Sequence, residues 1–175
     1  MFEFLLKHKT KKILESQKRE KVFLNWNKIQ KILIVFNSKD YEEADAFIEY
    51  LEKKGRHIKV YAYKDKSDNY DYSETPYSIV TQKILKDWSG ESLRVLVNNL
   101  KSEQYDLALD LSLQRNLILE YLFANANALL KAGYKKSDLP FYDLSITSLP
   151  IQDEKSSKYV TELARQVIYY LTTMR

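Results

Sequence analysis

Short apolar runs alternate with amphipathic stretches along most of the chain. The run KILIVF at residues 31–36 is continuous, β-branched and aromatic, which is typical of a strand buried on both faces. YDLALDL at 105–111 is nearly as continuous, and the stretches between such runs repeat apolar residues at the i, i+3, i+4, i+7 spacing of helices. This alternation predicts the α/β class, with one doubly wound, mostly parallel, Rossmann-like sheet in which 31–36 and 105–111 are neighbouring central strands.

The other elements follow from the same periodicities. The helix after the first strand is well marked, because Asp40 and Glu43 fit a capping box and Gly55 stands where a C-terminal cap belongs. Residues 64–78 are polar, rich in tyrosine and interrupted by Pro76, which predicts a long surface loop. Further strands are expected at 57–63, 79–85, 129–134 and 143–149, and further helices at 2–20, 93–100, 117–125 and 156–173, although 79–85 fits either period.

The length and the charge distribution predict one domain preceded by a basic helix. A chain of 175 residues suits a single domain with a substantial core. Residues 1–31 hold nine basic and three acidic residues, whereas the remainder carries a net charge of −2. We therefore expect a basic helix and linker over 1–30 and a domain over 31–175. The basic segment suits contact with phosphates or anionic lipid, but its broken apolar stripe favours a solvated helix that can be removed without unfolding the domain.

Composition excludes several classes of site. There is no cysteine, and the two histidines, His8 and His57, are far apart, so thiolate catalysis, the common zinc sites and multi-histidine metal centres are excluded. The glycine fingerprints of dinucleotide and P-loop nucleotide sites are absent, as is a GxSxG nucleophile elbow, and we expect no cofactor. No apolar run reaches the roughly 18 residues of a membrane span. The first residues have the reverse order of a secretory signal, which predicts a cytoplasmic protein.

Candidate binding residues lie where the two central strands end. In open α/β sheets, ligands bind beyond the carboxyl ends of strands at the point where strand order reverses. The polar residues expected there are Asn37, Ser38, Lys39 and Asp40 after the first strand, and Asp110, Ser112, Gln114 and Asn116 after the later one. Helix capping and tight turns explain the same residue types and are the commoner reason for them. The alternative is a small enzyme in which Asp110, its pKa raised by desolvation, is the general base and Ser112, Asn37 and Ser38 orient the substrate.

The predicted loop offers a second candidate surface. Tyr70, Tyr72, Tyr77 and Trp88 could stack on bases or sugars. Carboxylates interleave with these rings and would repel a phosphate backbone, so nucleic-acid binding through the loop is disfavoured. Aromatic residues that attach a long loop to its domain are the commoner case.

From Lys31 onward, the motifs YDLALDLS, NANALL and KAGY resemble a family of short uncharacterised proteins from Bacteroidales and their relatives. More remotely, they are similar to the N-terminal Rossmann-like half of heptosyltransferase-type glycosyltransferases. That resemblance rests on Tyr105, Asp106, Asp110, Ala128 and Gly133. The glycine-rich acidic acceptor loop of those enzymes is replaced here by NSKDYEEAD, and the domain that holds the sugar nucleotide is missing. The resemblance therefore implies that this chain has the same fold but does not catalyse glycosyl transfer.

Three functions remain in order of preference. The first is a non-catalytic Rossmann-like domain that binds a protein partner or a small polar ligand, because no catalytic signature accompanies the fold. The second is the small enzyme based on Asp110. The third is a membrane or nucleic-acid contact through the basic helix. The sequence leaves a homodimer open.

Overall fold

The computed structural model describes residues 2–87, 90–150 and 158–174. Its centre is a six-stranded sheet with the strand order β3-β2-β1-β4-β5-β6, and every neighbouring pair is parallel. The strands are β1 (Lys31–Asn37), β2 (His57–Lys64), β3 (Ser78–Thr81), β4 (Tyr105–Asp110), β5 (Ala128–Tyr134) and β6 (Leu144–Ile146). The predicted doubly wound α/β fold is confirmed.

The two central strands are those with the most continuous apolar runs. Ile32 of β1 pairs with Leu107 of β4, as the sequence predicted for neighbours. Successive β1 side chains enter two different cores, since Ile34 belongs to the cluster on one face of the sheet and Leu33 and Val35 belong to the cluster on the other. Both faces of β1 are covered, and for this reason its sequence is apolar at consecutive positions and does not alternate.

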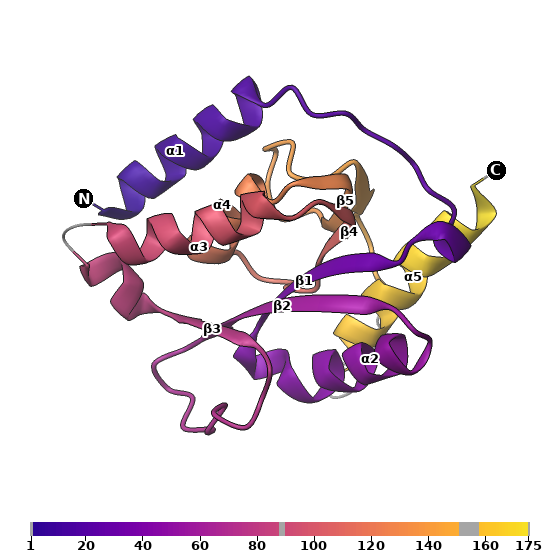
Figure 1. The fold of residues 1–175 in the computed structure, drawn as a ribbon, viewed down its shortest axis with the longest axis horizontal. Helices are drawn as coiled ribbons and strands as arrows, with labels where there is room; N and C mark the ends of the chain where they lie inside the picture. The colour runs from indigo at the N-terminus through magenta and orange to yellow at the C-terminus, as the bar shows by residue number, and fades with distance from the viewer. Residues whose placement is uncertain (1, 88–89, 151–157, 175) are drawn as a thin grey trace.

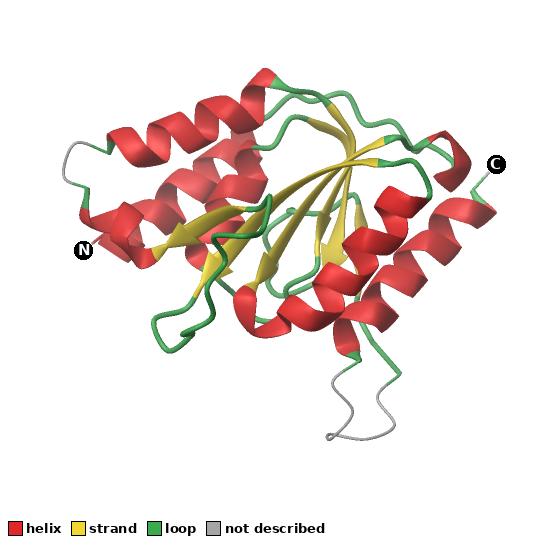
Figure 2. Ribbon diagram, turned by 60° about the horizontal axis from the view of Figure 1, so that its bottom comes forward, coloured by secondary structure: helices red, strands yellow, loops and turns green. Residues whose placement is uncertain are grey.

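Helices cover the two faces of the twisted sheet (Figures 1 and 2). Side chains of α2 and α5 enter one core cluster, and those of α1, α3 and α4 enter the other. The helices are α1 (Phe2–Ser16), α2 (Tyr41–Lys53), α3 (Glu91–Ser102), α4 (Leu117–Asn125) and α5 (Tyr159–Thr173). The predicted start of the last helix at Ser156 and the candidate Trp88 lie outside the described residues.

The N-terminal segment packs on the domain. Leu6 and Thr10 of α1 are buried, and α1 lies against α4. Beyond α1, Arg19 donates hydrogen bonds to the carbonyls of Ala128 and Leu129 and pairs with the buried carboxylate of Asp143. The division of the chain at residue 30 stays a prediction.

Local signals were right at one end of α2 and wrong at the other. Gly55 has φ 78° and follows the helix as a C-terminal cap, with its N–H donating to Glu52 O. The capping box is a correction, because the side chain of Asp40 makes no cap hydrogen bond. A short 3-10 turn, Ser38–Asp40, precedes the helix and gives Asp40 φ −100° and ψ 15°, outside the extended region that a capping side chain needs.

Three further elements differ from the sequence predictions. The strand expected at 143–149 is limited to β6, Leu144–Ile146. The first helix ends at Ser16 and not near residue 20. The segment predicted as strand over 79–85 divides into β3 and a 3-10 helix, Gln82–Lys86. The ambiguous periodicity of this segment therefore reflects two different elements in succession.

Candidate functional site

Strand order reverses between β1 and β4, so the loops after these strands lie at the topological switch point. The two predicted loops meet there. Lys39 Nζ, from the loop after β1, donates a hydrogen bond of 2.6 Å to Gln114 Oε1, from the loop after β4. The structure thus brings together two of the residues selected from the sequence.

The two asparagines have local roles. Asn37 Oδ1 accepts from Lys39 N at 3.3 Å and caps the 3-10 turn. Asn116 Oδ1 accepts from Ile118 N and Leu119 N at 3.0 and 3.1 Å and caps α4. Each amide oxygen therefore accepts from backbone N–H groups of its own loop or helix and acts as a cap.

Asp110 is the centre of a buried cluster. Its Oδ2 accepts from Lys136 Nζ at 2.6 Å and from Tyr142 Oη at 2.7 Å. Its Oδ1 accepts from Ser112 N at 2.9 Å and from Ser112 Oγ. Asp110 and Ser112 are 1% and 2% exposed, and the Lys136 side chain is 4% exposed. The carboxylate therefore has four donors around its two oxygens and little access to solvent.

The ammonium of Lys136 also has several hydrogen-bond partners. Besides Asp110, its ammonium donates to Ser112 O at 2.9 Å and approaches Ser112 Oγ at 3.2 Å. The ring of Tyr142 lies close to Gly133, where an added Cβ would be 2.6 Å from Cε1 of the ring. Burial, and then the charge of Asp110, raises the pKa of Tyr142 well above its usual value, so the phenol stays neutral and donates.

Sequence reasoning missed Lys136 and Tyr142, which follow β5 in the chain. Because β5 is parallel to β4 and pairs with it through Asp110 and Gly133, residues after Tyr134 emerge beside Asp110. The polar residues KK at 135–136, directly after a predicted strand, were the available signal.

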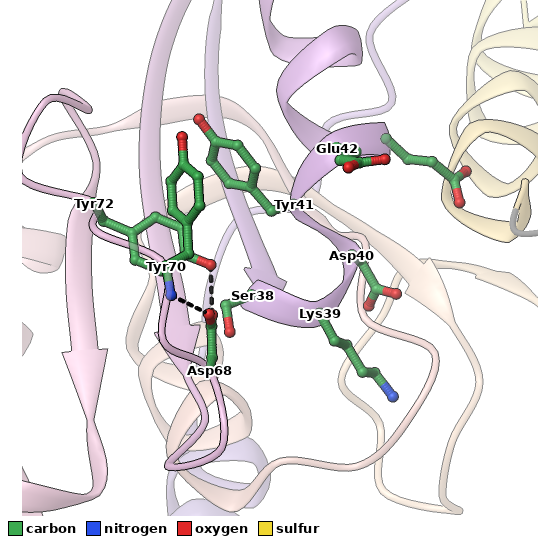
Figure 3. Close-up of a pocket in the computed structure, with 9 residues that line it drawn as sticks. Ser38, Lys39, Asp40, Tyr41, Glu42, Asp68, Tyr70 and Tyr72 are labelled. Atoms are coloured by element: carbon green, nitrogen blue, oxygen red, sulfur yellow. Dashed lines mark hydrogen bonds between the residues drawn. The ribbon is translucent and has the colours of Figure 1, made fainter.

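A more open pocket of about 450 Å³ lies beside the switch point, where β1 leads into α2 (Figure 3). It combines the loop after β1, the first turn of α2 and the 65–77 loop. Its lining residues are Ser38, Lys39, Asp40, Tyr41, Glu42, Glu43, Asp68, Tyr70 and Tyr72. Five predicted candidates thus line a common cavity although they come from two different loops: Ser38, Lys39 and Asp40 from one, and Tyr70 and Tyr72 from the other.

Three tyrosine rings form one wall of this pocket. The centroid of Tyr41 is 5.1 Å from that of Tyr70 and 5.3 Å from that of Tyr72, and those of Tyr70 and Tyr72 are 4.7 Å apart. Asp68 fixes the loop by accepting from Tyr70 N and from Tyr72 Oη, as Figure 3 shows. Tyr72 is buried and Tyr70 is half exposed. The rings therefore both attach the loop, as expected, and present an aromatic surface to the cavity.

The polar side of the pocket is acidic. Oδ2 of Asp40 is buried and accepts no hydrogen bond from the described residues. Burial raises the pKa of Asp40, although the neighbouring charge of Lys39 acts in the opposite direction. Glu43 is already engaged, because its Oε2 accepts from Thr161 N and Oγ1 at 3.0 Å. Burial, and then the bond to Asp68, raises the pKa of Tyr72 to about 12, so its hydroxyl is neutral at physiological pH.

Comparison with known proteins assigns the chain to a family. Residues 3–174 match DUF6913, which is described as a family of unknown function. The chain belongs to the DUF6913 family. No curated protein and no solved structure matches it. The DUF6913 match includes α1 as well as the sheet, so both predicted segments of the chain lie within one family match.

Two features are absent from the described part of this DUF6913 chain. Across residues 2–87, 90–150 and 158–174, no group of three or more histidine, aspartate or glutamate side chains is arranged to hold a metal ion. None of the helices described is both long enough and apolar enough to span a bilayer.

Proposed function

We propose that this domain binds a small, neutral polyhydroxyl ligand of the sugar type in the pocket beside β1, without transforming it. The observation that carries this proposal is that one cavity is lined both by three tyrosine rings in mutual contact and by Asp40, whose Oδ2 is buried and unpartnered among the described residues. Aromatic faces suit the apolar C–H side of a sugar ring. A ligand hydroxyl would supply the donor that Asp40 lacks once the side chain turned its buried Oδ2 toward the cavity.

The charge of the pocket selects against phosphorylated ligands. Asp40, Glu42 and Glu43 lie at the start of α2, where a phosphate would otherwise be favoured by the helix dipole. Lys39 is the one basic residue of the nine that line the cavity, and its ammonium donates to Gln114. A neutral ligand avoids this repulsion.

The relation to heptosyltransferase-type N-terminal halves belongs to the same proposal. The segment NSKDYEEAD, which takes the place of their acceptor loop, supplies six of the nine lining residues. A domain of this type that retained a sugar-binding function at this segment would hold its ligand in the pocket beside β1.

The enzymatic alternative assigns Asp110 as a general base. Asp110 would have to release one of four hydrogen-bond donors, including the ammonium of Lys136, before it could accept a proton from a substrate. The tyrosine wall of the open pocket is accessible without breaking any such bond, and we therefore prefer binding.

Thermal shift with neutral hexoses, heptoses and disaccharides, compared with sugar phosphates and nucleotides, tests the proposal. At ten times its Kd a ligand stabilises the fold by about 1.4 kcal/mol. Tyr70→Ala should abolish the shift given by a neutral sugar. Tyr169→Ala, which removes a ring of comparable exposure from α5, should keep it. Stabilisation by phosphorylated ligands alone, or equal loss in both variants, would contradict the proposal.

A further inference from the structure

The outward side of α1 is basic. The inward side of this helix buries Leu6 and Thr10 against the domain. Its four lysines are all exposed, and Lys11 lies 3.6 Å from Glu15 in a solvent-exposed pair, whereas the other three make no ion pair with a described residue. The lysines are Lys7, Lys9, Lys11 and Lys12.

Two apolar side chains share this exposed surface at the beginning of the helix. Phe4 is 73% exposed and is the most exposed large apolar residue in the described part of the chain, and Leu5 beside it is 48% exposed. Other apolar side chains hold α1 on the domain, since Leu6 is buried in the core and Ile13 and Leu14 pack against it. The helix therefore presents apolar and cationic groups together to the outside.

Helix α2 has the reverse charge. α2, across the sheet from α1 (Figure 1), carries five acidic residues and one lysine. A negatively charged surface would attract the α1 side and repel the α2 side, which orients the whole molecule before contact.

We propose that α1 docks the protein on the surface of an anionic lipid bilayer, with Phe4 and Leu5 entering the headgroup layer and the lysines beside lipid phosphates. A bilayer fits this surface better than a nucleic acid does, because a phosphate backbone would satisfy the lysines but leave both apolar side chains in water. In this orientation the acidic pocket beside α2 remains open to the aqueous side.

The size of the effect follows from the charges. Each lysine near an anionic surface strengthens binding about fivefold, and salt screens the attraction over a Debye length of about 10 Å at 0.1 M. Replacing two of the four lysines should therefore weaken binding roughly 30-fold at low salt.

Vesicle flotation with the full chain tests the proposal, with phosphatidylcholine vesicles compared with vesicles that also contain about one third phosphatidylglycerol. The charge variant is Lys9→Gln/Lys12→Gln and the apolar variant is Phe4→Ser/Leu5→Ser. The control for the charge variant is Lys53→Gln/Lys54→Gln, which replaces the last residue of α2 and the residue after it. The control for the apolar variant is Phe23→Ser, which replaces a side chain that is 49% exposed and lies outside α1. Equal thermal unfolding of all variants shows that the fold is intact.

We expect the wild type and both controls to float with the anionic vesicles and not with the neutral ones. The charge variant should bind roughly 30-fold more weakly, and the apolar variant should lose the binding that persists in high salt. Equal partition of the wild type into the two vesicle types would overturn the proposal, as would unchanged binding of both α1 variants. Binding to duplex DNA or single-stranded RNA in the absence of vesicle binding would assign the surface to nucleic acid and overturn it as well.

Discussion

Replacing Lys131 with methionine tests how the fold accommodates a lysine in its core. Lys131 lies in β5 with 1% of its surface exposed, and its Nζ donates bonds of 3.0 Å to Phe123 O and Ala124 O near the end of α4. Burial, and then the charge of Arg19, lowers the pKa of Lys131 to about 7, although Asp143 acts in the opposite direction. A neutral amine has two N–H groups, one for each carbonyl, so deprotonation preserves both bonds.

The lowered pKa makes stability depend on pH in one direction. An unfolded chain keeps this lysine protonated to about pH 10.4, whereas the folded chain releases the proton at about pH 7. Between these values the unfolded state binds more protons, so the free energy of unfolding rises with pH, by at most about 1.4 kcal/mol per pH unit. The upper limit from pH 7 to pH 10 is roughly 4 kcal/mol, and below pH 7 this contribution is constant.

Urea unfolding followed by circular dichroism from about pH 6 to about pH 10 measures the effect. The difference in unfolding free energy between the wild type and Lys131→Met isolates it, because other titrating groups are common to both proteins. That difference should be flat near pH 6 and should rise in favour of the wild type above pH 7. Lys135→Met removes a half-exposed lysine just after β5 and should give a flat difference throughout. A flat difference for Lys131→Met as well would refute the reasoning.

Three other expectations can be measured by the same urea titrations. Asp110→Asn should lower the free energy of unfolding by about 3–5 kcal/mol, because it leaves the buried ammonium of Lys136 without its counter-charge. Adding Lys136→Met to the same chain should recover part of that loss. A loss below about 1 kcal/mol would mean that the pair is not buried in solution. Gly133→Ala should cost about 1–3 kcal/mol by displacing the ring of Tyr142, and a neutral result would contradict that contact. A chain without residues 1–16 should still unfold cooperatively. A chain without residues 1–20 also loses Arg19 and should be less stable by a further ~1–3 kcal/mol. Equal stability of the two truncated chains would exclude a stabilising role for Arg19.

The sheet could be predicted because its central strands are buried on both faces. A residue in β1 or β4 contacts a core whichever way its side chain points. The strands therefore need apolar residues at consecutive positions, and this pattern is visible in KILIVF and YDLALDL without knowledge of the fold. The α4 helix is a partial exception. It is buried on more than one side, since Glu120 and Asn125 are buried along with its apolar residues and α1 lies against it.

The candidate site could be predicted only where a contact follows from strand order. Placing β1 beside β4 was enough to bring Lys39 to Gln114. Lys136 and Tyr142 required the further knowledge that β5 pairs with β4, and the pocket required the conformation of the 65–77 loop. That loop is held by contacts between tyrosine rings and by the carboxylate of Asp68. The periodicity of the sequence does not predict such contacts.

The parallel pairing of β1 with β4 also determines when the central sheet can form while the chain is being synthesised. One side of β1 can be paired early, since Lys31 pairs with His57. Its other side waits for β4, because Ile32 pairs with Leu107, roughly 75 residues later in the chain. At about 5–20 residues per second, a ribosome takes roughly 4–15 s to supply that partner. Throughout this interval the most apolar strand of the molecule has an open edge, so the nascent chain is most exposed to aggregation, and to chaperone binding, before residue 110 has left the exit tunnel.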